Sequence, residues 1–423
     1  MSESKNIASG TLASAQGVTG NLLKSTKGDK VIWAIVILLT MISILVVYSS
    51  IGSLAYRSNK STESYLFKQV FYIGLGVMII YFAHRVNYTV YSKWATILFL
   101  ISVPLLLYTL FFGTSINEAN RWIKLPVINL TFQTSDLAKL ALFMYMSRLL
   151  SRRQNVIKDF KKGFLPLILP VAIICILIAP ANLSTAVLIG GIGLLLMFIG
   201  RVSVRHIMMV IGGALIPIII LVTIAGSYYD KEEHVSKDLP AVLSVGRVPT
   251  WVKRTQNFMY GGKEDASYQV QQAKIAIATG GFLGKGPGKS EQRNFLPHPY
   301  SDFIYAIIIE EYGLVGGTII LLIYLLFLFR SIRLFQRCPY AFGAFLAVAL
   351  SFTLVIQAMV NMAVNVDIFP TTGVTLPLVS MGGSSLLFTC ASIGIILSVA
   401  RNVEQAEGKG LALATQQTEE KAS

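Results

Sequence analysis

The run VIWAIVILLTMISILVVYSSI at residues 31–51 decides the fold. A helix needs about 20 mostly apolar residues to cross a bilayer, and this run reaches that length without a charged residue. It is longer than the roughly 7–15 apolar residues of a signal-peptide core, and no small-residue cleavage site follows it. We therefore predict an uncleaved first membrane helix behind a disordered cytoplasmic tail at residues 1–30.

The composition extends this interpretation to the whole chain. Hydrophobic residues make up 54% of the sequence and charged residues only 13%, about half of the roughly 25% usual in soluble domains. We predict an all-α integral membrane protein of about ten transmembrane helices, with one membrane domain over residues 31–402 and a cytoplasmic C-terminal tail over 403–423. The nine further apolar runs lie near 66–83, 93–112, 134–150, 164–180, 184–200, 206–225, 303–329, 342–364 and 384–400.

The positive charges indicate the orientation. The net charge of +15 would also suit a nucleic-acid partner, but the basic residues gather in short connections between apolar runs, as Lys and Arg do on the cytoplasmic side. We expect both termini in the cytoplasm and no nucleic-acid binding. The three cysteines lie inside or beside predicted spans, so we expect no disulfide. The cation-rich connections lie near 84–85, 148–162, 201–205 and 330–337.

The segment 226–302 then forms one large extracytoplasmic loop between the seventh and eighth helices. Loops of this length inside compact domains are usually functional. We expect a Pro-Thr-Trp turn at 249–251, a short amphipathic helix near 266–279 and a glycine-rich passage at 280–288. The stretch 284–290 is similar to a phosphate-binding P-loop, but Leu283 stands where that motif requires glycine.

Asp302 is the first candidate functional residue. It lies where the large loop enters the eighth helix. Ionisable groups at the edge of a membrane span are costly unless they are paired or hydrated, which makes each a candidate site. A carboxylate in this position can act as a general base or hold a divalent cation. Alternatively, Asp302 only caps the helix, because aspartate is a favoured N-cap residue.

Three other polar places interrupt the apolar pattern. Asp136 and Lys139 are three residues apart and share a helix face, so they either neutralise each other or leave Lys139 to bind an anionic group such as a phosphate. Asn182 lies in a polar break at 180–186 that is typical of a tight turn. The stretch 369–385, which ends on Ser384 and Ser385, predicts either a plain loop or irregular backbone lining a ligand surface.

Taken together, these motifs resemble the SEDS family of shape, elongation, division and sporulation proteins. The resemblance extends from about residue 30 to 402, and Thr375-Leu376-Pro377 is more similar to its division-type members than to its elongation-type members. It is carried by Gly284-x-Gly286-x-Gly288, Leu296-Pro297 and Ser301–Ala306, by Pro370–Ser385, and by Asn120–Ile123 with Gln133–Lys139.

This resemblance implies a peptidoglycan glycosyltransferase that polymerises lipid II at the outer face of the cytoplasmic membrane during cell division. The essential acid of the family falls on Asp302, which would deprotonate the acceptor sugar in an inverting transfer, directly or with a divalent cation such as Mg²⁺ or Mn²⁺. Undecaprenyl pyrophosphate would leave, stabilised by Arg121, Lys139, Arg247 or Lys274. The resemblance implies no organic cofactor.

The implied partners are the nascent glycan strand, a class B penicillin-binding protein transpeptidase, other division proteins at the septum, and membrane lipid. Asp136, Ser384 and Ser385 join the substrate-binding candidates. The chain departs from the family at Asp136, where glutamate is common, at Asn182, where an acid is common, and at Met381, where tyrosine is common. The alternatives are a lipid II flippase and a non-enzymatic division scaffold. The flippase is disfavoured because a transporter is expected to carry charged groups near mid-membrane and often internal repeats, whereas this sequence concentrates its polar residues at the outer face and shows no internal repeat.

Overall fold

The computed structural model describes residues 28–422, apart from 53–61, 117–118, 125–130, 231–234, 237–239, 241–246, 261–264 and 298. Most of the predicted N-terminal tail, residues 1–27, lies outside this part of the chain.

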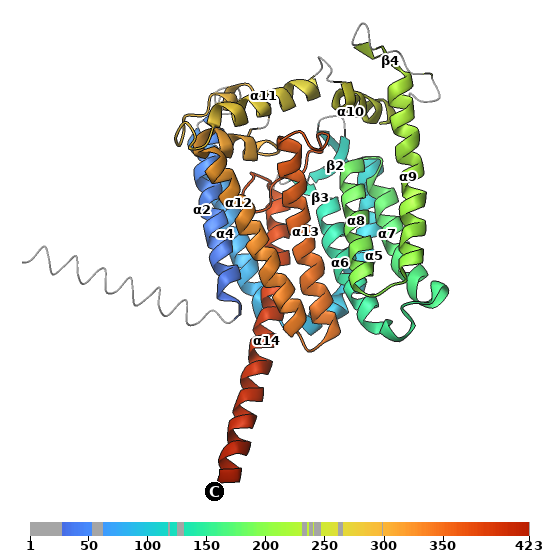
Figure 1. The fold of residues 1–423 in the computed structure, drawn as a ribbon, viewed down its shortest axis with the longest axis vertical. Coiled ribbons are helices and arrows are strands. Elements are labelled where there is room, and N and C mark those ends of the chain that lie inside the picture. Colours follow the sequence, from blue (N-terminus) through green and yellow to red (C-terminus); the bar gives the residue numbers. More distant parts are fainter. Residues whose placement is uncertain are drawn as a thin grey trace, which may run out of the picture.

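A bundle of long apolar helices forms the body of the protein (Figure 1). Eight helical segments in the described part are long and apolar enough to cross a membrane. Two further helices complete the set: α8 (Leu183–Ile199) is shorter, and α6 (Thr134–Arg152) carries polar residues. The all-α membrane fold predicted from the sequence is confirmed. The eight are α2 (Lys30–Ser50), α4 (Thr62–Arg85), α5 (Tyr88–Phe112), α7 (Leu165–Ile178) with the preceding turn η2 (Phe160–Phe164), α9 (Val204–Ser227), α12 (Ile304–Arg337), α13 (Ala341–Asn365) and α14 (Ser384–Ala422).

The helices differ strongly in how much protein surrounds them. α13 is mostly buried and contacts α12 and α6, while α14 packs against α4 and α5 packs against α6. By contrast, α9 lies at the edge of the bundle, where its few contacts are with α8 and α10, and its apolar side chains are mostly exposed (Figure 1). An exposed apolar helix of this length is expected to face lipid.

Two short helices lie across one end of the bundle, here called the loop end (Figure 1). They are α10 (Val248–Tyr260) and α11 (Asp265–Gly280), preceded by the strand pair β4 (Tyr229–Asp230) and β5 (Val235–Ser236) and followed by η3 (Gln292–Asn294). The predicted helix near 266–279 is confirmed as α11. The predicted turn at 249–251 is wrong, because Pro249 lies in the first turn of α10, where its missing N–H is not needed.

A small antiparallel sheet joins α5 to α6 at the loop end. It consists of β1 (Thr114–Ile116), β2 (Ala119–Lys124) and β3 (Thr131–Gln133) in that order. Its register pairs Trp122 with Gln133 and Ile123 with Phe132. The sequence pattern predicted no strand here, because strands of three to six residues are too short to show a clear alternation.

The helix α12 is interrupted at Gly313, where φ is 70°. The glycine-rich passage after α11 docks into this interruption: Leu314 N–H donates to Gly281 O at 2.9 Å, and Gly286 N–H donates to Glu311 O at 2.9 Å. A Cβ at Gly284 would lie 2.2 Å from Glu311 O, and one at Gly313 would lie 2.1 Å from Phe282 O. Only glycine allows the two backbones to approach so closely. The far end of the bundle, opposite the loop end, holds the α12–α13 connection and the 3₁₀ turn η1 (Gln154–Val156).

Candidate functional site

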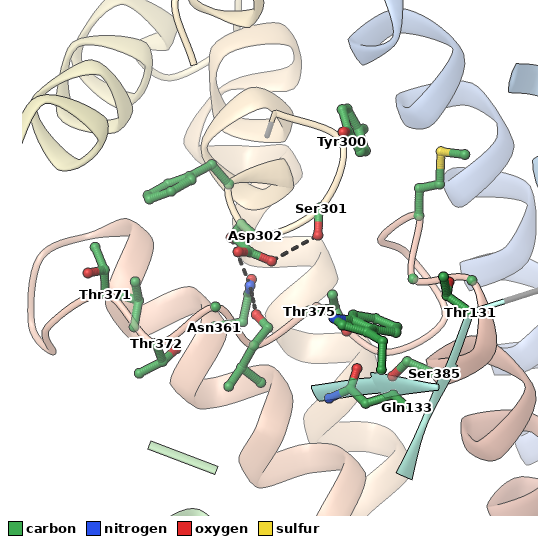
Figure 2. A pocket seen from close by; sticks show the side chains of 18 of the residues that line it. Thr131, Gln133, Tyr300, Ser301, Asp302, Asn361, Thr371, Thr372, Thr375 and Ser385 are labelled. Carbon is green, nitrogen blue, oxygen red and sulfur yellow. Dashed lines mark hydrogen bonds between the residues drawn. The ribbon is translucent and has the colours of Figure 1, made fainter. Parts of the chain in front are cut away.

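A cavity of about 690 Å³ lies at the loop end of the bundle, and Asp302 forms part of its wall (Figure 2). This volume is within the range of small-molecule binding sites, roughly 300–1,000 Å³. The wall is contributed by α4, by β2 and β3, by α10 and α11, by the turn before α12, and by α13, the start of α14 and the connection between them. Its charged residues in the described part of the chain are Lys68, Arg247, Arg254 and Asp302.

Asp302 is held in place through its backbone carbonyl. Its carbonyl oxygen accepts hydrogen bonds from Asn361 Nδ2 at 2.9 Å and from Asn365 Nδ2 at 3.0 Å, both on α13. Its carboxylate accepts a hydrogen bond from the Ser301 hydroxyl at 2.8 Å (Figure 2). Since Asn361 and Asn365 are almost fully buried, the position of Asp302 is set by a rigid helix behind it and the side chain is left at the cavity wall.

A side chain of α13 caps the start of α12. Asn365 Oδ1 accepts a hydrogen bond from the Ala306 N–H at 3.1 Å, in the first turn of α12. One asparagine therefore caps the helix with its oxygen and holds Asp302 with its nitrogen. Asn365 thus satisfies one of the N–H groups at the start of α12, and a capping role for Asp302 remains an alternative.

The 371–385 connection is fastened to the same turn. The Ser380 hydroxyl donates to Ser301 O at 2.6 Å and accepts from Leu376 N–H at 2.8 Å, and Met381 N–H donates to Tyr300 O at 2.9 Å. This connection is therefore no plain loop, because it is hydrogen-bonded to the turn before α12 and forms one side of the cavity. Of the two predicted arrangements, the structure has the irregular backbone that lines a cavity.

The cavity wall carries more positive than negative charge. Arg254 donates from Nη1 to Thr371 O at 3.1 Å, and Arg247 donates from Nη1 to Ala181 O at 2.7 Å. Burial lowers the pKa of Arg254, the neighbouring Arg247 cation lowers it further, and Asp302 opposes both effects. With Lys68 there are three cations and one carboxylate among the described wall residues, so the wall favours an anionic ligand.

Sequence reasoning identified Arg247 but missed Arg254. The two are seven residues apart, which is two helical turns and hence one helix face. That signal was hidden because the segment from Pro249 to Trp251 was interpreted as a turn. The structure has α10 begin at Val248, so Arg247 directly precedes the helix and Arg254 lies in its second turn. Both are wall residues of the cavity.

Asp136 and Lys139 form a buried polar network behind the cavity. Lys139 Nζ donates to Asp136 Oδ1 at 3.2 Å and to Gln357 Oε1 at 2.8 Å, and Gln357 Nε2 donates to Thr375 O at 3.0 Å. Thr375 is a wall residue. Of the two predicted arrangements, the structure has the neutralising pair, and it links that pair to the 371–385 connection. Binding of substrate by Asp136 or Lys139 remains a prediction.

The other predicted substrate-binding residues are dispersed. Ser385 is a wall residue, whereas Ser384 sits at the start of α14 with its hydroxyl accepting from Gln133 N–H at 3.2 Å. Arg121 lies in β2, and its side chain is outside the described part of the structure. Lys274 of α11 forms an ion pair with Asp367, is half exposed, and is not among the described wall residues.

Asn182 has the structural role that the polar break predicted. It is the N-cap residue of α8, and its Oδ1 accepts a hydrogen bond from Thr185 N–H at 3.3 Å. The tight turn between α7 and α8 is therefore confirmed. The neutral amide caps the helix without adding the charge that an acid would place there.

Glu310 holds the segment that leads to Asp302. Its carboxylate is fully buried and accepts hydrogen bonds from Lys285 Nζ at 3.0 Å, from Glu291 N–H at 3.0 Å, and from the Ser290 hydroxyl. The segment 285–292 is thereby attached to α12 about one turn before the interruption at Gly313. Sequence reasoning did not assign this role, because a glutamate inside an apolar span gives no indication of which distant donors surround it.

A divalent cation at Asp302 remains a prediction. No group of three or more His, Cys, Asp or Glu side chains that could hold a metal occurs among the described residues. Mg²⁺ commonly binds to only one or two carboxylates together with substrate phosphates, and Asp302 offers one such carboxylate.

Comparison with known proteins identifies close similarity over nearly the whole chain. The family model of FtsW, RodA and SpoVE, described as cell cycle protein, matches residues 29–405. A protein of Geobacter sp. (strain M18) called probable peptidoglycan glycosyltransferase FtsW is 33% identical over 382 residues, which cover 89% of this chain and 98% of that protein. Stage V sporulation protein E of Bacillus subtilis (strain 168) is 30% identical over 384 residues, with the same coverage.

Solved structures show the same fold. One, described as structural coordination of polymerization and crosslinking by a peptidoglycan synthase complex, has a TM-score of 0.67 and 23% sequence identity, and the match covers 89% of this chain and 99% of that one. The crystal structure of the rod shape determining protein RodA of Thermus thermophilus has a TM-score of 0.61 and 23% identity, over 89% of this chain and 97% of that one.

Proposed function

Because the chain belongs to the FtsW/RodA/SpoVE family of cell cycle proteins, we infer that it is a peptidoglycan glycosyltransferase of the cell-division type. It is an integral membrane protein and polymerises lipid II into glycan strands. We propose Asp302 as its catalytic base. The observation that carries this proposal is the Asp302 carboxylate in a cavity whose other described charges are cations. Two buried asparagines fix the residue by donating hydrogen bonds to its backbone carbonyl.

In the proposed reaction the 4-hydroxyl of the acceptor sugar gives its proton to the Asp302 carboxylate while its oxygen attacks the anomeric carbon of the second substrate. A C–O bond forms at that carbon as the bond to undecaprenyl pyrophosphate breaks, and the configuration inverts. The proton ends on Asp302 and the negative charge leaves on the pyrophosphate. General-base catalysis of this kind contributes about 10²–10⁴-fold.

The cations of the wall suit the leaving group. Arg254 lies on α10 and Arg247 directly before it, and each is fixed by a hydrogen bond to a backbone carbonyl. Fixed cations beside a developing charge stabilise the transition state without reorganisation, and a guanidinium matches the geometry of phosphate oxygens. A bound Mg²⁺ or Mn²⁺, held by Asp302 and the pyrophosphate, would neutralise further charge.

The loop end is proposed to face the outside of the cytoplasmic membrane. Basic residues that include Arg152, Arg333 and Arg337 lie at the far end, as the positive-inside rule requires of the cytoplasmic side. Both termini are then cytoplasmic. The structural relative described as a peptidoglycan synthase complex that coordinates polymerization and crosslinking supports a transpeptidase partner. We propose that this partner is a class B penicillin-binding protein and that the two act at the division septum.

The test compares wild-type protein with the Asp302→Asn variant, each co-expressed with its transpeptidase and incubated with lipid II and Mg²⁺. Asp367→Asn is the matched control, because Asp367 lies at the same end but outside the described cavity wall. We expect glycan strands on a gel from wild type and Asp367→Asn, and none from folded Asp302→Asn. Equal polymer from all three would exclude Asp302 as the base, and no polymer from any would favour the flippase or scaffold alternatives.

A further inference from the structure

A second cavity, of about 580 Å³, lies at the far end of the bundle, on the opposite side of the protein from Asp302. It is enclosed by the starts of α5 and α13, the end of α6, the α12–α13 connection and the part of α14 near Asn402. Its volume is again that of a ligand site. The proposed glycosyl transfer does not use it, because catalysis takes place at the loop end.

The wall of this cavity carries three cations, Lys93, Arg148 and Arg152, and no aspartate or glutamate among its described residues. None of the three forms an ion pair with a described carboxylate. Arg148 is half-buried and fixed, since its Nη1 donates to Ser92 O and, at 3.0 Å, to Thr96 Oγ1, which are both neutral. The charge that gathers here is therefore not neutralised within the described part of the protein.

Another arginine at the same end shows the contrast. Arg330 is paired with Asp29, with its Nη2 2.6 Å from Oδ2. Neutralising a cation at this end of the bundle is therefore possible in this fold, and Arg330 has such a partner. An uncompensated group of three cations in one concave wall is suited to an anion that the chain itself does not supply.

The side chains around the cavity place it at the depth of lipid headgroups. Tyr88 stacks on Phe342 with ring centroids 6.2 Å apart, and Tyr340 and Trp94 are more than half exposed. Tyrosine and tryptophan concentrate at membrane–water interfaces. Lys93, one residue before Trp94, is exposed at this level.

The surface of α5 then continues from the cation toward the bilayer centre. Ile97 and Leu100 follow Lys93 by four and seven residues, and they are 47% and 63% exposed. Residues with these spacings share one face of a helix. A charged headgroup at Lys93 would thus have its acyl chains beside an apolar stripe of the same helix, which a soluble phosphate could not use.

We propose that this cavity binds the phosphate headgroup of an anionic phospholipid of the cytoplasmic leaflet, through Lys93, Arg148 and Arg152. Basic pockets between membrane helices on this side of a membrane are suited to such headgroups. Lys93 and Arg152 are the exposed cations that reach the phosphate, and Arg148 is the fixed charge at the back. Bound lipid would join α5, α6 and the α12–α13 connection.

The test is a titration of the purified full-length protein with dioctanoyl-phosphatidylglycerol, followed by native mass spectrometry. We expect one preferred site in wild type. The double variant Lys93→Gln/Arg152→Gln should bind about 25-fold more weakly, at about fivefold for each cation near an anionic headgroup. The matched control Lys161→Gln/Arg205→Gln removes two exposed cations near the same end that are not among the wall residues, and should bind as wild type does.

Two further probes separate the possible sources of the phosphate. Dioctanoyl-phosphatidylcholine should bind at least tenfold more weakly than the phosphatidylglycerol, because its headgroup is neutral overall. Inorganic phosphate at equal concentration should not displace the lipid. Displacement by inorganic phosphate would overturn the lipid assignment in favour of a soluble anion, and equal losses in the two double variants would overturn the site. Thermal midpoints of both variants within about 2 °C of wild type would show that neither result reflects unfolding.

Discussion

Replacement of Glu310 by glutamine tests how the segment before Asp302 is held in place. The carboxylate is fully buried and accepts hydrogen bonds from Lys285 Nζ at 3.0 Å, from two backbone N–H groups at 3.0 and 3.3 Å, and from the Ser290 hydroxyl. Glutamine has nearly the same shape, but the replacement removes the negative charge and places an NH₂ group where a carboxylate oxygen had accepted hydrogen bonds. Breaking a buried ion pair costs about 3–5 kcal/mol.

The expected loss of stability is toward the lower end of that range. Lys285 is 24% exposed and is partly solvated when its partner is lost, and the glutamine oxygen keeps one acceptor. We expect Glu310→Gln to lower the free energy of unfolding by about 3 kcal/mol. The measurement is SDS-induced unfolding in mixed micelles followed by circular dichroism. Hydrogen exchange should show faster exchange in residues 285–292.

The matched control is Glu291→Gln, because Glu291 also lies near Lys285, at 3.4 Å, but is 74% exposed. Exposed ion pairs contribute about 0.2–1 kcal/mol, so this variant should lose less than about 1 kcal/mol. A further Lys285→Met change should cost clearly less in the Glu310→Gln background than in wild type, since its partner is already absent. Equal losses for Glu310→Gln and Glu291→Gln would refute the view that burial makes Glu310 the main anchor.

Three other replacements or treatments address the cavity. Asn365→Ala removes both the cap of α12 and one of the two donors to Asp302 O. We expect it to lower the free energy of unfolding by about 1–3 kcal/mol and to lower kcat at similar KM in lipid II polymerisation. An unchanged kcat would contradict the positioning role. Arg254→Ala should slow polymerisation by about 10²-fold with partial rescue by Arg254→Lys, whereas equal rates in all three would remove Arg254 from the leaving-group site. EDTA should stop polymerisation and added Mg²⁺ or Mn²⁺ should restore it; full activity in EDTA would mean that Asp302 acts without a metal.

The fold was largely predictable because the membrane restricts the choices. Every backbone polar group must be satisfied inside its own segment, so an apolar run of about 20 residues becomes a helix almost regardless of context. The runs near 31–51 and 342–364 accordingly match α2 (Lys30–Ser50) and α13 (Ala341–Asn365) closely. Outside the apolar runs this constraint is absent, and α10 and the three-stranded sheet were missed there.

The candidate site was predictable only in part. Asp302, Arg247 and Ser385 were named from motifs, and the structure places all three on one wall. Arg254 and Lys68 were not named, because each looks like an ordinary loop or interface cation until the chain around it is folded. Lys274 was named with the leaving-group cations, but it is paired with Asp367 on the half-exposed side of α11.

The sequence by itself determined the membrane helices and the residue that resembles the family's essential acid. The tertiary structure alone decided what surrounds that acid: Asn361 and Asn365 hold Asp302 from a helix about 60 residues away in sequence, and Glu310 gathers its donors from a loop about 20 residues earlier. The physical reason is the range of the interactions. Burial of an apolar run depends on composition within one segment, whereas a hydrogen bond or an ion pair depends on atoms within about 3 Å that distant segments bring together.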